Sequence, residues 1–196
     1  MKSVFYNSSL DEAFLADSSF SLTKPKEIKD LGDGLFALLD GDKAIGFNLK
    51  HPSEHGLELS EGLNPVLKGD NKAALEKLLS SKGYAGFGYG ESSHFLVAKI
   101  VKEEEHPVFE SSRILTLSIG GKTLSTVTRY ANCHVGDKIV VKTEGYRFDG
   151  TVFEARVEKN IPIDCEVCSP LELKASDEGK QAYIENSKEE GEDYFA

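Results

Sequence analysis

The spacing of apolar and polar residues changes near residue 94. From there on, apolar side chains tend to recur at every second position in five short runs separated by turn-forming residues. This period of two is typical of half-buried β-strands, and five such runs within about 65 residues predict a small closed or partly closed barrel. The runs are residues 95–101, 113–119, 122–128, 137–143 and 152–159.

The alternation also predicts which side chains face the interior of the barrel. In the fourth run it places Ile139 and Val141 inside, and Val140 and Lys142 outside. A barrel of five strands is filled by its own side chains and has no interior pocket. Any ligand must therefore be held on the outer surface and in the loops.

The first half of the chain predicts a small α+β domain. Residues 2–7 are rich in β-branched and aromatic side chains, and residues 33–50 form two apolar runs around an Asp-Gly-Asp turn, which predicts a hairpin. Residues 70–83 predict a helix that begins at Asp70 and ends at a glycine. The glycine- and aromatic-rich stretch 83–91 predicts a domain boundary.

Charge and composition narrow the function. The 196 residues carry a net charge of −10, and residues 177–196 contribute seven acids against two lysines. Because strong, sequence-blind polyanion binders are usually basic, we expect no such activity. Three cysteines without disulfide spacing, no apolar run of about 18 residues and no signal-like start predict a cytoplasmic protein outside the membrane.

Short motifs in the barrel segment match a known pattern: Ile100-Val101, His106-Pro107, Asn132, Val135-Gly136, Cys168-Ser169 and Glu172-Leu173. With these motifs the segment resembles the tRNA-binding OB-fold domain of the phenylalanyl-tRNA synthetase β subunit and of the C-terminus of many methionyl-tRNA synthetases. It departs from that pattern at Arg129 and Tyr130, which replace small residues. The first half, with the hairpin over residues 33–50, also resembles the N-terminal domain of bacterial YtpR-type tRNA-binding proteins.

This resemblance implies an α+β N-terminal domain over residues 1–90, an all-β five-stranded OB-fold barrel over 91–174 and an acidic tail over 175–196. It implies a non-catalytic tRNA-binding protein that recognises backbone and shape. It further implies homodimerisation through residues 160–173. An aminoacyl-tRNA synthetase is a second expected partner beside tRNA.

An OB barrel holds nucleic acid with cations and with planar side chains on which bases stack. The sequence predicts phosphate contacts from Arg129, Lys142 and Arg147, stacking by Tyr130 and loop support by Asn132. For the lysines, a solvated strand face is the alternative, and Asn132 can instead bridge local backbone. The complete predicted RNA-binding set is Arg129, Tyr130, Asn132, Lys138, Lys142, Arg147, Lys99 and Lys122.

No catalytic set, cofactor site or metal site is expected. Cys165 and Cys168 form a Cys-x-x-Cys pair, but a structural zinc needs four ligands, and the other candidates, Cys133 and His134, lie about 30 residues away. We interpret the pair as small buried residues. The protein is expected not to be an enzyme.

Two other functions remain open. A docking module for the translation machinery would use the acidic first half and tail, and would show an exposed apolar patch. A generic single-stranded nucleic-acid binder would need several aromatic side chains on its strands, and the five runs offer few. A further hypothesis is that the acidic tail mimics RNA and competes for the basic face.

Overall fold

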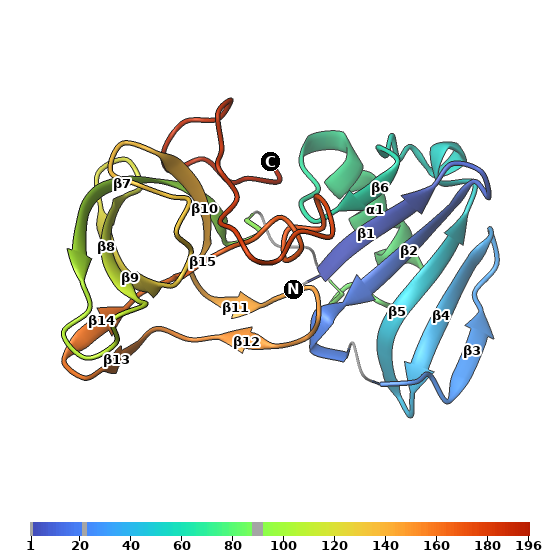
Figure 1. The fold of residues 1–196 in the computed structure, drawn as a ribbon. Helices are drawn as coiled ribbons and strands as arrows, with labels where there is room; N and C mark the ends of the chain where they lie inside the picture. Colours follow the sequence, from blue (N-terminus) through green and yellow to red (C-terminus); the bar gives the residue numbers. More distant parts are fainter. Residues whose placement is uncertain (1, 21–22, 88–91) are drawn as a thin grey trace. The chain divides into compact units, whose positions relative to one another are not determined.

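The computed structural model describes residues 2–20, 23–87 and 92–196, and these divide into two compact units. The first consists mainly of residues up to Ser92 and the second mainly of residues from Ser93. The stretch 88–91, part of the predicted domain boundary, lies outside the described residues. Figure 1 labels the elements of both units.

The first unit is an antiparallel sheet of six strands in the order β3-β4-β5-β2-β1-β6 (Figure 1). Its strands are β1 (Lys2–Asn7), β2 (Glu12–Asp17), β3 (Glu27–Asp30), β4 (Leu35–Asp40), β5 (Lys43–Lys50) and β6 (Gly62–Asn64). The other elements are α1 (Gly69–Ser81) and the short 3-10 helices η1 (Ser18–Phe20) and η2 (Pro52–His55).

The prediction of an α+β domain here is wrong, because the described chain is mostly β with α1 as its one α-helix. Three of the six strands, β2, β3 and β6, lie in stretches that sequence periodicity did not mark as strands. Two of them have only three or four residues, too few for alternation to register. The predicted hairpin is confirmed as β4 and β5, with Gly41 at φ +62° in the turn.

One face of this sheet packs against α1 and the loops beside it. The helix presents Leu75 and Leu79, each 1% exposed, to a core that includes Phe47 at the centre of the sheet. Tyr84 and Phe87 follow the helix and pack edge-on against the Phe47 ring. This face of the sheet therefore forms the core of the first unit.

The second unit contains a nearly closed antiparallel sheet in the order β15-β10-β7-β8-β9 (Figure 1). This topology is consistent with an OB-like fold. Its strands are β7 (Phe95–Glu105), β8 (Arg113–Ser118), β9 (Thr123–Thr128), β10 (Lys138–Lys142) and β15 (Glu166–Val167). Outside it lie β11 (Gly145–Tyr146), β12 (Val152–Phe153), β13 (Arg156–Glu158) and β14 (Ile161–Ile163).

The fifth strand of the barrel differs from the one that the sequence predicts. Residues 152–159 belong to β12 and β13, which lie in an excursion between β10 and β15. The barrel closes instead at β15, whose two residues are too few to show alternation. Thr126 of β9 donates from Oγ1 to the carbonyl oxygen of Cys165 at 2.6 Å, which ties the open edge of β9 to the segment entering β15.

Residues 177–196, which belong to the predicted acidic tail, contain no helix. They form two bridges to the barrel strands. Ile184 pairs with Ile139 on the part of β10 that β15 does not cover, and Asp193 pairs with Leu96 on the part of β7 that β8 does not cover. The backbone N–H of Gly191 donates to the Val97 carbonyl at 2.8 Å. The C-terminal segment is therefore part of the barrel wall.

Candidate nucleic-acid interface

A hollow of about 450 Å³ opens on the second unit where three elements meet. They are the loop 106–112 between β7 and β8, the end of β9, and the turn of the β13–β14 hairpin. Loops at these positions are those with which OB-like barrels bind oligonucleotides. The residues lining the hollow are His106, Phe109, Ser112, Val127, Thr128, Arg129, Glu158 and Lys159.

The loop 106–112 is held by its first residue. The Nδ1 atom of His106 accepts hydrogen bonds from the backbone N–H groups of Val108 and Phe109, both at 3.1 Å. The neutral ring therefore carries its proton on Nε2. Its face lies 4.8 Å, centroid to centroid, from the Phe109 ring. The predicted motif residue His106 thus fixes the loop and places an aromatic side chain, Phe109, which is 45% exposed, at the hollow.

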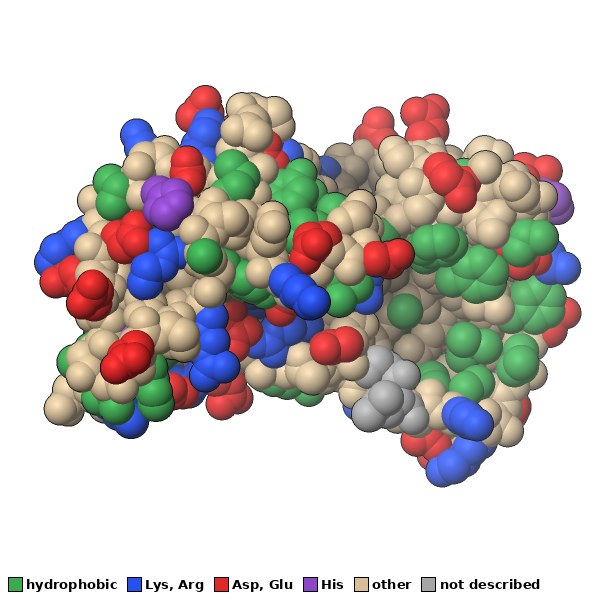
Figure 2. Space-filling model, in the orientation of Figure 1, with side chains coloured by type: hydrophobic (Ala, Val, Ile, Leu, Met, Phe, Trp, Pro, Cys, Tyr) green, Lys and Arg blue, Asp and Glu red, His purple; other side chains and the backbone are tan. Residues whose placement is uncertain are grey.

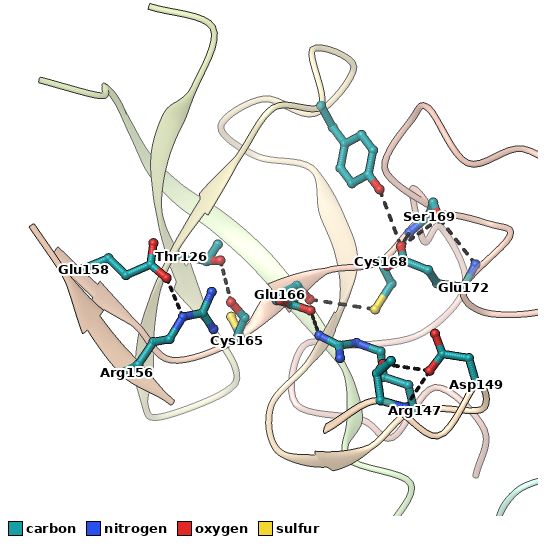
Figure 3. Close-up of polar contacts among 12 residues, drawn as sticks. Thr126, Arg147, Asp149, Arg156, Glu158, Cys165, Glu166, Cys168, Ser169 and Glu172 are labelled. Atoms are coloured by element: carbon teal, nitrogen blue, oxygen red, sulfur yellow. Dashed lines mark hydrogen bonds and ion pairs between the residues drawn. The ribbon is translucent and has the colours of Figure 1, made fainter. Parts of the chain in front are cut away.

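The opposite wall comes from the β13–β14 hairpin. Its two turn residues, Lys159 and Asn160, have φ values of +50° and +65°, as a type I′ turn requires. The turn directs Lys159 so that its Nζ atom lies 4.2 Å from the centroid of the Phe109 ring. This cation–π contact between Lys159 and Phe109 joins the two walls. Arg156 and Glu158 form an ion pair on the same hairpin, at 2.5 Å (Figure 3).

Arg129 lies at the end of β9 and is exposed. Within the described residues, its guanidinium makes no hydrogen bond or ion pair. Arg129 belongs to the corner between β9 and β10. Arg113 holds this corner, because it donates to the carbonyl oxygens of Tyr130 and Cys133 and pairs with Glu103. Arg113 thus positions the corner and leaves Arg129 available to a ligand.

The hollow combines positive charge with apolar walls. Arg129 and Lys159 stand against Glu158 alone among its lining residues, and Arg156 pairs with that carboxylate. The local balance is therefore positive although the whole chain is at −10. An aromatic face with two cations within reach is the arrangement that suits a phosphate backbone with an accessible base.

Three other predicted RNA-binding residues face the C-terminal segment. Tyr130 packs against the barrel core, and its hydroxyl is 3.5 Å from Glu172 Oε2; burial raises its pKa. Asn132 hydrogen-bonds the backbone of Ala182, while Lys138 donates to the Lys188 carbonyl at 2.6 Å. These side chains hold the second unit together. The predicted stacking role of Tyr130 finds no support in this placement.

Lys142 and Arg147 are also engaged within the unit. Lys142, expected on the outer surface, is 1% exposed, donates to the Ser93 carbonyl at 2.9 Å and lies over the Phe95 ring. Burial lowers the pKa of its ammonium to about 8. Arg147 forms an ion pair with Glu166 (Figure 3). Val140, likewise predicted to face outward, is fully buried.

The last two predicted cations are exposed but lie at the other end of the β8–β9 hairpin. Lys122 belongs to the turn that connects these strands, and Lys99 pairs with Ser118 beside it. Arg129 follows the opposite end, so about six residues of strand, or about 17–20 Å, separate it from Lys122. The structure therefore brings together only Arg129 and His106 of the residues singled out from sequence.

The Cys168-Ser169 motif has a structural role. Ser169 donates from N and from Oγ to Glu172 Oε2, each at 2.7 Å, and its Oγ accepts from the Glu172 N–H at 3.3 Å (Figure 3). This reciprocal arrangement is a capping box. Cys168 is buried, which raises its pKa, and burial raises that of Cys165 to about 12. Neither is a reactive thiolate.

No group of three or more His, Cys, Asp and Glu side chains in the described chain could hold a metal ion. No helix in those residues is long and apolar enough to cross a membrane. The chain matches no model of a known protein family and no curated protein. Any functional inference therefore depends on the geometry of this surface and on the sequence resemblance.

Sequence reasoning did not single out Phe109, Lys159 and Arg113 as site residues. Phe109 follows the His106-Pro107 motif and belongs to no matching motif itself. Lys159 was placed in a barrel strand, although Lys-Asn between two short β-runs is a usable signal for a type I′ turn. No local pattern indicates that Arg113 reaches the carbonyl of a residue 17 positions away.

Proposed function

We propose that this protein binds structured RNA of the tRNA class without catalysis, at the hollow between the loop 106–112 and the β13–β14 hairpin. The observation that carries the proposal is the meeting of Arg129, Lys159 and the exposed ring of Phe109 at one hollow of an OB-like barrel. The motif resemblance around His106-Pro107 supports the same ligand class.

In this proposal the two cations contact neighbouring phosphates, and a base or a sugar takes the place of the Lys159 ammonium against the Phe109 ring. Both kinds of contact tolerate any sequence, so recognition depends on the path of the backbone and on which bases are unstacked. Two or three phosphate contacts suit a chain at −10, because a larger basic surface is absent from the hollow. The expected binding is therefore modest and strongly dependent on salt.

The test is a titration with unfractionated tRNA at about 50 and 200 mM salt, where neutralising two or three phosphates should weaken wild-type binding by about tenfold. Replacing Arg129 and Lys159 by alanine should weaken binding at the lower salt and flatten the salt dependence. The matched control removes two exposed lysines at the far end of the hairpin, Lys99→Ala with Lys122→Ala.

If the control pair weakens binding as much as the Arg129 and Lys159 pair, the hollow is not the site. Absence of any binding at the lower salt overturns the proposed function. Circular dichroism of each variant checks that the barrel is intact.

A second candidate function is docking of a protein partner of the translation machinery, such as a synthetase. The specific observation that favours it is the exposure of apolar side chains on the loop and the hairpin that flank the hollow: Val108 is 56% exposed and Val157 is 69% exposed. Together with Phe109 they offer an apolar contact that RNA does not need. This function would be favoured if the wild-type protein binds a synthetase but not tRNA, and if Val157→Glu abolishes synthetase binding.

A further inference from the structure

The sheet of the first unit has an uncovered face that carries aromatic side chains in a row. Cross-strand pairing joins Phe5 to Phe14, Phe14 to Asn48, and Asn48 to Phe36, on strands β1, β2, β5 and β4. All four alternate with residues of the buried core, so they point away from α1. Figure 2 shows hydrophobic side chains gathered over the strands of this sheet.

The neighbouring row is apolar and mostly small. It crosses the same strands through Ser3, Ala16, Gly46 and Leu38, and continues to Ile28 on β3. Ile28 is 65% exposed and Phe5 is 44% exposed. The solvated face of an antiparallel sheet is normally polar, so two adjacent apolar rows mark a surface that is covered in the working state.

The charges on this face argue against RNA as its cover. Lys50 lies 5.8 Å from the centroid of Phe36, but its Nζ is also 3.8 Å from Glu12 Oε1. Asp30 on β3 is paired with Phe36 at the end of the aromatic row. A stacking platform for nucleic acid needs unneutralised cations along it, and this face has acids in those places.

The face is complementary to itself. β5 and β2 are the two central strands of the six. A two-fold axis that runs parallel to these strands, midway between them and midway between the two sheets, places β2 of one copy over β5 of the other. Because Glu12 and Lys50 are cross-strand partners, this axis sets Glu12 opposite Lys50 of the second copy. In the aromatic row it sets Phe5 opposite Phe36. It likewise sets Phe14 opposite Asn48. One charged pair and one pair of rings therefore face each other.

The extent of the face suits such an interface. The six strands lie about 4.8 Å apart; four of them are about 20 Å long or longer, and β3 and β6 are about 10–13 Å long, which gives a flat area of about 500 Å². Because side chains corrugate the surface, its accessible area is larger than this flat projection. The accessible area therefore approaches the value of about 800 Å² per partner that is typical of a stable interface. The row of small residues lets the second sheet approach to the about 10 Å spacing of packed sheets.

We propose that two copies of this chain associate face to face through these sheets, with the two-fold axis between β2 and β5. The segment 160–173, which the family resemblance implies as a dimer contact, already buries Ile161, Ile163 and Val167 within its own unit. On the sheet face, by contrast, Phe5 and Ile28 stay 44% and 65% exposed. This association is independent of the RNA hollow, and it would give each assembly two such hollows.

Sedimentation velocity from about 1 to 100 μM tests the association, a range that covers dissociation constants typical of reversible dimers. Wild type is expected to dimerise, and Phe5→Lys with Ile28→Lys should weaken the dimer at least about tenfold, since each introduced charge would be buried in apolar surface. The matched control places lysines at two exposed valines of the second unit, Val135 and Val157, and should leave the dimer unchanged.

Cross-linking tests the geometry even if a lysine variant fails to fold. A mixture of Phe5→Cys and Phe36→Cys chains should be joined by a bis-maleimide spanning about 10 Å, whereas Phe5→Cys alone should link poorly. The native cysteines are buried and do not compete. A wild type that stays monomeric throughout, or a dimer that only the control variant disrupts, would overturn the proposal.

Discussion

Asn132 and Ala182 exchange two hydrogen bonds across 50 residues of sequence: the Asn132 Nδ2 donates to the Ala182 carbonyl at 2.9 Å, and the Ala182 N–H donates to Oδ1 at 2.8 Å. The amide thereby pairs with backbone as a neighbouring strand would. It anchors the start of the C-terminal segment to the corner between β9 and β10. This use leaves no free amide for a ligand.

Replacing Asn132 with alanine should therefore lower stability and leave RNA binding little changed. The loss of both bonds, with a half-buried backbone pair left open, should cost about 1–3 kcal/mol in free energy of unfolding. Urea unfolding measures it. Asn132→Asp keeps the acceptor and loses the donor, so it should be intermediate in a series at neutral pH. Weaker tRNA binding with unchanged stability would contradict this interpretation.

Deleting residues 177–196 should destabilise the second unit. The deletion removes the backbone partners of Phe95 and Val97 on β7 and of Lys138 on β10. Unpaired strand edges and an uncovered core should lower the unfolding free energy by several kcal/mol. Thermal unfolding of the truncated chain measures this. If the truncated chain instead stays fully stable and binds tRNA more tightly, the segment acts as an electrostatic mimic of RNA.

Gly191→Ala is a single-residue version of the same test. Gly191 has φ +89°, and a Cβ atom there would lie 2.6 Å from the carbonyl oxygen of Ile119. Both the backbone conformation and the close contact disfavour a side chain, so we expect a loss of about 1–3 kcal/mol. Gly121→Ala is the control, because φ is also positive there, at +112°, but no heavy atom lies within 4 Å.

Lys142 should make stability rise with pH in the alkaline range. Its pKa is about 8 in the folded chain, against 10.5 when it is exposed. Below pH 8 the ammonium is protonated in both states, and the cost of burying it is present in full. Between pH 8 and 10.5 the unfolded chain binds more protons, so the unfolding free energy increases with pH, by about 2–4 kcal/mol.

Comparing wild type with Lys142→Met isolates this effect from other groups that titrate in the same range, such as Tyr194, whose pKa burial raises. The difference in unfolding free energy between the two proteins should narrow or reverse as pH rises from 7 to above 10. A difference that is constant with pH would mean that Lys142 is not buried as an ammonium.

Substitutions at Phe109 and Tyr130 should distinguish a ring that contacts the ligand from a ring that supports the fold. Phe109→Ala should weaken tRNA binding by about 1–3 kcal/mol, the usual value of one stacked base. Tyr130→Phe should leave it unchanged, because the hydroxyl faces Glu172 within the unit. Filter binding at low salt, with circular dichroism as the folding control, measures both. The reverse order of effects would place the ligand on the far side of the β9–β10 corner.

The sequence predicted those elements whose signal is local and long. The helix α1, the β4–β5 hairpin and the strands β7 to β10 repeat a clear period over at least five residues. Short strands such as β3, β6 and β15 depend on pairing with distant chain, which no local pattern reports. The mostly β character of the first unit was missed for that reason.

The site was predictable only in part for a related reason. Arg129 and His106 were found because family motifs and residue type drew attention to their loops. Lys138 and Lys142 have the same residue type as a phosphate ligand, but one hydrogen-bonds the C-terminal segment and the other is buried beneath it and the chain around Ser93. Residue type alone cannot separate a solvated lysine from one that donates to a backbone carbonyl.

The backbone and side chain of Asp193 and its neighbours bond to Ser93 and β7, a separation of 100 residues. In the first unit, by contrast, every strand pairing is made within residues 2–64. Long-range closure slows folding, because the entropy of a large loop is lost before its contacts form. We therefore expect two kinetic phases, in which the first unit assembles early and the barrel becomes complete only when the last residues of the chain reach their places in its wall.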